Sequence, residues 1–154
     1  MKNNFLTRLW PTKPFLRPAQ EKALVQGIQA AEKNTSGEIR VHIEAKLPKE
    51  DPFERALELF QELQMHQTRQ RNGVLFYLAL ADHKFAIVAD EGINQVAPDG
   101  FWDSIWDEMQ YAFQEKRFTE GLLKGIAQTG EKLKAHFPYQ KEDENELPDT
   151  ISKS

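Results

Sequence analysis

The chain has 154 residues and a formal net charge of −4, with 40% hydrophobic and 29% charged residues, which is the size and composition of one globular domain. It has no cysteine, so disulfide bonds, thiolate zinc sites and cysteine nucleophiles are excluded. The mild acidic balance argues against a nucleic-acid-binding protein, which usually carries a basic surplus. No apolar run approaches the ~20 residues that a membrane span needs, so we expect a cytoplasmic protein without membrane contact.

The two ends of the chain differ in charge. Residues 1–17 are basic and contain no acidic residue, whereas residues 139–154 are rich in acidic residues. We expect an irregular basic arm and an acidic tail, both in solvent, on either side of a domain that spans residues 18–138. The start is no secretory signal by its pattern, because Pro11 and Pro14 interrupt it and no apolar stretch follows.

The first half of the domain predicts a helix, a strand and a second helix. Residues 19–33 place apolar side chains on one face at helical spacing. Residues 38–44 alternate between apolar and polar, which is typical of a strand with one buried face. Asp51 followed by Pro52 is a helix start signal, so a helix is expected over 53–64. Its expected buried stripe consists of Phe53, Ala56, Leu57, Phe60 and Leu63.

The second half predicts a hairpin and two more helices. Residues 74–80 form an unbroken apolar run, as expected of a central strand covered on both faces. Residues 85–89 return as its antiparallel partner. An acidic loop at 90–94 follows, and helices are expected over 101–113 and from Thr119 to near Pro138.

This order of elements predicts a three-layer α/β/α sandwich with a mixed sheet of three to four strands. The first two strands are joined through a helix, so they should be parallel with a right-handed crossover. The hairpin makes the third strand antiparallel. A fourth, short edge strand is expected in the arm or the tail, without a defined position.

Four segments, read in order, carry a family resemblance: TSGEIRV at 35–41, RNGVLFY at 71–77, IVADEGI at 87–93 and FTEGLLKGI at 118–126. Their order and spacing resemble a TPM domain, a family named after its thylakoid, plant and worm members. The resemblance implies an α/β/α sandwich and, in some members, calcium bound in acidic loops. It also implies acid phosphatase activity in a plant relative and membrane anchors in many members.

Two features of this chain set it apart within that family. No apolar run is long enough for an anchor, so we expect the soluble bacterial variety. Many relatives have two glycines in the loop after the hairpin, whereas here only Gly92 remains. The loop is then stiffer and more acidic, which weakens any transfer of phosphatase activity.

Strand directions bring several acidic residues together. The antiparallel third strand ends beside the starts of the first two, and the third helix starts at the same end of the sheet. We therefore expect five carboxylates to converge there with the amides of Asn72 and Asn94; they are Glu38, Asp90, Glu91, Asp99 and Asp103. Like charges repel unless a cation neutralises them. Hard oxygen ligands on a flexible loop suit Ca²⁺, with Mg²⁺ as the alternative.

The same acids also have structural explanations. Asp99 can cap the third helix, Asp90 can stabilise a turn, and Glu91 can simply face water. The chain has no loop of the EF-hand kind. A second acidic group gathers at the opposite end of the sheet and consists of Glu44, Glu50, Asp51 and Asp82 with His83. In this group Asp51 is better explained as a helix cap and Asp82 as a turn residue.

The histidines, arginines and tryptophans give weaker evidence about function than the acidic residues do. No two histidines have the spacing of a zinc site, and His42 is expected to be packed or at the surface. A phosphatase would need a cationic side chain for the phosphate beside the acids, and Arg40 and Arg71 are the nearest candidates. Trp106 is either packed or an exposed contact residue.

Three functions remain open. The first is a non-catalytic, cation-responsive binding or regulatory module that docks an unidentified protein partner. The second is a metal-dependent acid phosphatase of low activity. The third is a metal-free structural adaptor that uses the basic arm with Trp10 or Trp106 as contacts.

Overall fold

The computed structural model describes residues 16–139 and 145–154. Its elements are α2 (Pro18–Glu32), β1 (Glu38–Glu44), α3 (Pro52–Glu62), β2 (Gly73–Ala79), β3 (Lys84–Ala89), α4 (Glu91–Val96), α5 (Asp103–Gln114), α6 (Phe118–His136) and β4 (Ser152–Lys153). Most of the predicted basic arm, with Trp10, lies outside the described residues.

The sheet has four strands in the order β3-β2-β1-β4. β1 and β2 are parallel, with Glu38 opposite Gly73, and β3 returns antiparallel to β2. The mixed α/β fold predicted from the sequence is thus confirmed. β4 is the edge strand that the sequence left without a position, and it pairs parallel to β1, with His42 opposite Ser152.

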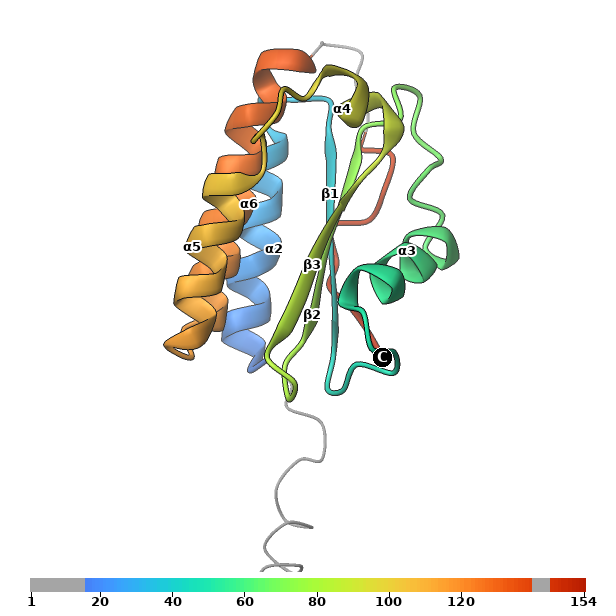
Figure 1. Ribbon diagram of the computed structural model, residues 1–154. Coiled ribbons are helices and arrows are strands. Elements are labelled where there is room, and N and C mark those ends of the chain that lie inside the picture. The colour runs from blue at the N-terminus through green and yellow to red at the C-terminus, as the bar shows by residue number, and fades with distance from the viewer. Residues whose placement is uncertain (1–15, 140–144) are drawn as a thin grey trace, which may run out of the picture.

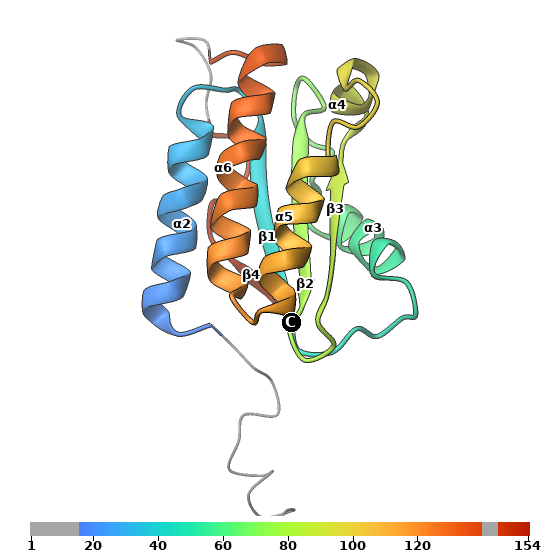
Figure 2. The same cartoon turned by 60° about the vertical axis from the view of Figure 1, so that its left-hand side comes forward.

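Helices cover both faces of this sheet. Figure 1 shows α2, α5 and α6 on one side and α3 on the other, and Figure 2 shows the three-helix side from the front. One apolar core lies between the sheet and the three helices, and it includes Ile39, Val41 and Ile43 of β1. A smaller core lies under α3 and includes Leu75 and Tyr77 of β2.

The alternation of β1 places its polar residues on the α3 side of the sheet. Glu38, His42 and Glu44 are nevertheless buried there, because α3 and the C-terminal segment, defined as residues 145–154, cover them. Figure 1 shows this segment in red on the same side of the sheet as α3. The described part of the predicted acidic tail is therefore anchored to the domain by two buried residues, Leu147 and Ile151, although half of its residues are exposed.

The structure corrects two further local expectations. The acidic loop at 90–94 is largely helical, because Asp90 caps the short helix α4 by accepting a hydrogen bond from the N–H of Glu91. In α3 the buried side chains are Ala56, Leu59 and Phe60, whereas Phe53 and Leu57 are exposed. Asp51 caps α3 as predicted, accepting from the N–H of Phe53 at 2.9 Å.

In the ranges that the structure describes, none of the helices combines the length and apolar character needed to cross a bilayer.

Candidate functional site

The strand directions inferred from the sequence are confirmed at the end of the sheet where β1 and β2 begin. The N–H of Glu38 donates to the carbonyl of Asn72 (3.2 Å), and the N–H of Asp90 donates to the carbonyl of Gly73 (2.9 Å). Glu38 and Asp90 thus flank Gly73 from opposite sides in the strand register. Their Cα atoms are separated by two strand spacings, roughly 10 Å.

Asp90 and Glu91 share Arg71 as a counter-ion. Nε and Nη2 of Arg71 each donate to one carboxylate oxygen of Asp90 at 2.9 Å, and Nη1 donates to Glu91 Oε1 at 3.2 Å. Gly92 permits this arrangement, because its N–H donates to the carbonyl of Arg71 (2.9 Å), and an added Cβ would lie 2.1 Å from the carbonyl oxygen of Gln70. Arg71, which lies outside the acidic loop, therefore serves as the counter-ion of Asp90 and Glu91.

The two remaining predicted ligands lie apart from this pair. Asp99 and Asp103 are both exposed, and Asp99 does not cap α5, whose first residue is preceded by Trp102 without a side-chain cap. Within residues 16–139 and 145–154, no three histidine, aspartate or glutamate side chains are already gathered as a metal site. The metal prediction at these five residues stays a prediction.

A different carboxyl group accompanies Glu38. Glu32, the last residue of α2, accepts a hydrogen bond from the N–H of Ile39 at 2.7 Å. Its carboxyl is hydrogen-bonded to that of Asp149 in the C-terminal segment and lies beside Glu38. The N–H of Glu146 donates to Glu38 Oε1. We call Glu32, Glu38, Asn72 and Asp149 the entrance cluster.

The electrostatics of the entrance cluster favour neutral carboxyl groups. Burial first, and then the hydrogen bond with Asp149, raise the pKa of Glu32 to about 10. Burial also raises the pKa of Glu38 to about 7, against the lowering effect of the hydrogen bond from Glu146. Two carboxyl groups can hydrogen-bond to each other only if one holds a proton. A proton therefore holds Glu32 and Asp149 together.

The entrance cluster has oxygen atoms without donors. Oε2 of Glu38, Oδ1 of Asn72 and Oδ1 of Asp149 are buried and accept no hydrogen bond from the described residues. Glu38 and Asn72 are only 2% and 1% exposed, so both side chains are removed from bulk solvent. A cavity of about 220 Å³ opens beside Glu38 and is also lined by Glu32 and Ser36, among other residues. The side-chain amide of Asn72 donates to Ser36 Oγ at 3.2 Å.

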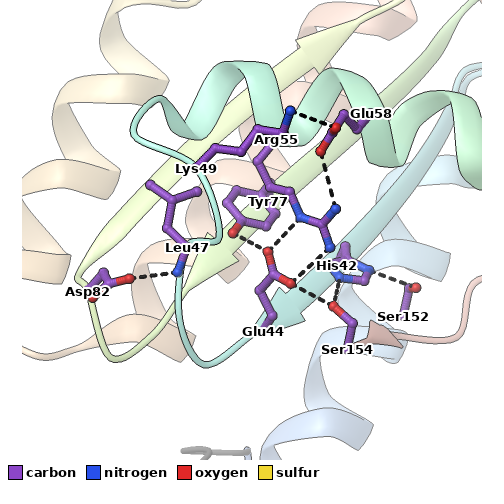
Figure 3. A network of polar contacts seen from close by, with 10 residues as sticks. All are labelled: His42, Glu44, Leu47, Lys49, Arg55, Glu58, Tyr77, Asp82, Ser152 and Ser154. Carbon is purple, nitrogen blue, oxygen red and sulfur yellow. Dashed lines mark hydrogen bonds and ion pairs between the residues drawn. The ribbon is translucent and has the colours of Figure 1, made fainter.

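The other end of β1 holds a second polar network, shown in Figure 3. Nε and Nη2 of Arg55 donate to the two carboxylate oxygens of Glu44 at 2.9 and 3.1 Å. The hydroxyl of Tyr77 also donates to Glu44, and so does the hydroxyl of Ser154 at 2.7 Å. Burial alone would raise the pKa of Glu44, but these hydrogen bonds outweigh it and lower that pKa. Glu44 is therefore a buried, ionised and fully bonded carboxylate.

His42 completes this network. Its Nδ1 lies 2.9 Å from Ser152 Oγ and its Nε2 lies 2.7 Å from Ser154 Oγ. Ser154 gives its only proton to Glu44, so it must accept from a protonated Nε2. Burial lowers the pKa of His42 to about 4, so the ring is neutral near pH 7. Nδ1 then accepts from the hydroxyl of Ser152.

Sequence reasoning found Glu38 and Asn72 but missed Glu32 and Asp149. Glu32 ends a helix, where an acidic residue opposes the helix dipole and gives no sign of burial. Asp149 belongs to a tail whose acidic composition indicated solvent. The available signal was the pair Leu147 and Ile151, two apolar residues that are buried in the structure.

Comparison with known proteins identifies relatives of the chain. A family model for the TPM domain matches residues 12–132. The solved structure of BA42, from the psychrophilic bacterium Bizionia argentinensis, is 47% identical, with a TM-score of 0.85. That match covers 92% of this chain and 97% of BA42.

More distant structures share the fold. The N-terminal domain of a protein from P. gingivalis is 22% identical with a TM-score of 0.65, over 79% of this chain and 78% of that one. The N-terminal domain of the cg2496 protein from Corynebacterium glutamicum is 13% identical with a TM-score of 0.53, over 88% and 76%. The comparison with curated proteins finds no match.

Proposed function

This chain belongs to the TPM domain family, and we propose that it is a binding module for a divalent cation held by the entrance cluster. The observation that carries the proposal is the set of buried oxygens without donors on Glu38, Asn72 and Asp149. Carboxylate and amide oxygens are the ligands of hard cations, and Ca²⁺ tolerates irregular arrangements of them better than Mg²⁺ does.

The proposed ion neutralises the carboxyl groups that protons neutralise in its absence. Glu32 and Glu38 are buried with raised pKa values, so without an ion they are neutralised by protonation. A divalent ion supplies that neutralisation at higher pH and draws the carboxylates of Glu32, Glu38 and Asp149 together. Asp90 and Glu91 keep Arg71 as their counter-ion, so we propose no role for them as ligands.

Thermal unfolding in calcium tests this proposal. An ion at a hundred times its Kd stabilises the folded state by about 2.7 kcal/mol, which corresponds to a rise in Tm of roughly 5–10 °C for a domain of this size. Glu38→Gln should remove most of that rise. The double variant Asp90→Asn with Glu91→Gln should keep it. A rise that survives Glu38→Gln and disappears in the double variant would move the site to the acidic loop.

One observation keeps a phosphatase as a second candidate. Arg40 lies between Glu38 and His42 on the same face of β1, and its Nε is buried and donates no hydrogen bond within the described residues. A metal-dependent phosphatase needs a cationic side chain for phosphate next to its ion, and Arg40 is placed to supply it. Hydrolysis of a phosphomonoester that requires calcium and is lost in Arg40→Met would favour this candidate.

A further inference from the structure

The C-terminal segment lies along β1 in the manner of a bound peptide. Near its start the N–H of Glu146 donates to Glu38, and at its end the N–H of Ser154 donates to the carbonyl of Ile43 at 3.1 Å. Between them, Leu147 is buried in the core under α3 and Ile151 in the three-helix core. The contacts therefore combine strand pairing with two aliphatic anchors, as in peptides that extend a sheet.

His42 and Glu44, which the C-terminal segment contacts at the edge of β1, favour hydroxyl groups as partners. Neutral His42 offers one donor and one acceptor, and Glu44 offers acceptors only. Ser154 satisfies both residues because its hydroxyl accepts from His42 and donates to Glu44. Ser152 donates to the other nitrogen of His42. An alanine would leave these buried groups without partners, and an acidic side chain would face the charge of Glu44.

This surface is built without the C-terminal segment. Glu44 is oriented by Arg55 of α3 and by Tyr77 of β2, and both partners belong to elements with their own cores. Figure 3 shows Ser152 of β4 and Ser154, which follows this strand, beside His42 and Glu44 of β1, while Tyr77 of β2 and Arg55 of α3 contact Glu44. A groove with its polar groups already oriented can therefore exist before a strand enters it.

The C-terminal segment forms few strand-pairing contacts with β1. β4 has two residues, whereas β1 has seven, all of which pair with β2. Half of the segment is exposed: Asn145, Pro148, Thr150, Lys153 and Ser154.

From these observations we propose that the edge of β1 is a docking groove for an extended segment of another protein. The segment that fits carries an aliphatic residue followed at the first and third positions by serine or threonine. Residues 151–154 of this chain, Ile-Ser-Lys-Ser, occupy the groove in the absence of that partner and compete with it. The occupant is recognised by its hydroxyls and its backbone, through His42, Glu44 and Ile43.

Binding of a labelled synthetic peptide with the sequence of residues 145–154 to the full-length chain tests the proposal. Ile151→Asp removes a buried anchor and should loosen the internal segment, whereas Thr150→Asp adds the same charge at an exposed position. Because the internal segment competes at high effective concentration, Ile151→Asp should bind the peptide about tenfold or more tightly than the wild type. Thr150→Asp should bind it as the wild type does. A peptide with both serines replaced by alanine should bind Ile151→Asp about tenfold more weakly.

Two outcomes would overturn the proposal. The first is an Ile151→Asp chain that unfolds cooperatively like the wild type and binds no peptide. The second is a wild-type chain that forms dimers which Ile151→Asp cannot form, since the occupant would then be a second copy of the chain.

Hydrogen exchange in the wild type keeps the test decisive if Ile151→Asp does not fold. The amides of Glu146 and Ser154 should share one protection factor, about a hundredfold or more below that of the β1–β2 amides. Equal protection across these three groups would mean that the segment leaves only on global unfolding, and the proposal would fail.

Discussion

Glu38, the first residue of β1, and Asn72, which directly precedes β2, are joined by a 3.2 Å backbone hydrogen bond. Each has a buried side-chain oxygen that accepts no hydrogen bond from the described residues. Such oxygens are costly to bury without a donor, and the proposed cation site rests on them. Near this point the carboxyl of Glu32 contacts that of Asp149, and burial raises the pKa values of Glu32 and Glu38.

Without divalent ions, the stability of the protein should fall as the pH rises. Glu38 has a folded pKa of about 7 and Glu32 one of about 10, both above the ordinary value of about 4.3 for an unfolded glutamate. The folded state therefore binds more protons than the unfolded state, and the stabilisation present below pH 4 is lost as the pH rises through the folded pKa values. Urea unfolding in a chelator from pH 5 to pH 9 measures this slope.

Glu38→Gln should reduce the fall in the free energy of unfolding with pH mainly below pH 7. Glu32→Gln should reduce this fall at higher pH as well, because the folded pKa of Glu32 is higher. Glu62→Gln, at an exposed position of α3, is the matched control and should leave the slope as it is. Wild-type stability that stays level or rises over this interval would contradict the protonated entrance cluster.

His42 should remain neutral to unusually low pH. Its folded pKa of about 4 lies below the ordinary value of about 6.5, so its contribution to stability is present above pH 6.5 and is lost as the pH falls toward 4. Long-range ¹H–¹⁵N spectra of the imidazole should show the tautomer with hydrogen on Nε2, unchanged down to pH 5. Titration of His42 near pH 6.5 would mean that the serine contacts do not enclose it in solution.

The free energy of unfolding should depend strongly on both members of the Glu44–Arg55 pair. Arg55→Met leaves a buried carboxylate with only hydroxyl donors, so the free energy of unfolding should fall by about 3–5 kcal/mol. Glu44→Gln combined with Arg55→Met removes the charge as well and should recover part of this loss. Lys49→Met, which removes only the exposed contact with Glu58, should change stability little. A loss in the double variant equal to the sum of the losses in Glu44→Gln and Arg55→Met would show that the two residues act independently.

The fold could be predicted largely from local patterns, whereas the site could not. The alternation of residues 38–44 and the apolar run of residues 74–80 each indicate a buried strand, because the local sequence alone shows which side chains avoid water. The helical state of Glu91–Val96 was missed because a polar six-residue segment has little helical periodicity. The choice between Phe53 and Leu59 for the buried face of α3 depends on how the helix is rotated against the sheet.

The partners of the acidic residues depend on contacts between distant parts of the chain. Strand direction correctly brought Glu38, Asn72 and Asp90 to one end of the sheet. It could not show that Arg71 turns back to bind Asp90, because this requires the left-handed backbone of Arg71 (φ 51°). Nor could it show that Asp149 reaches Glu32, since that contact joins the end of the first helix to the last residues of the chain.

A calcium titration followed by ¹H–¹⁵N chemical shifts at pH 7 tests the cation site most directly. The site at the entrance cluster predicts saturable shifts at the amides of Glu32, Glu38, Asn72 and Asp149, with Asp99 and Asp103 unmoved. Shifts confined to residues 90–103, or none at all at millimolar calcium, would contradict it.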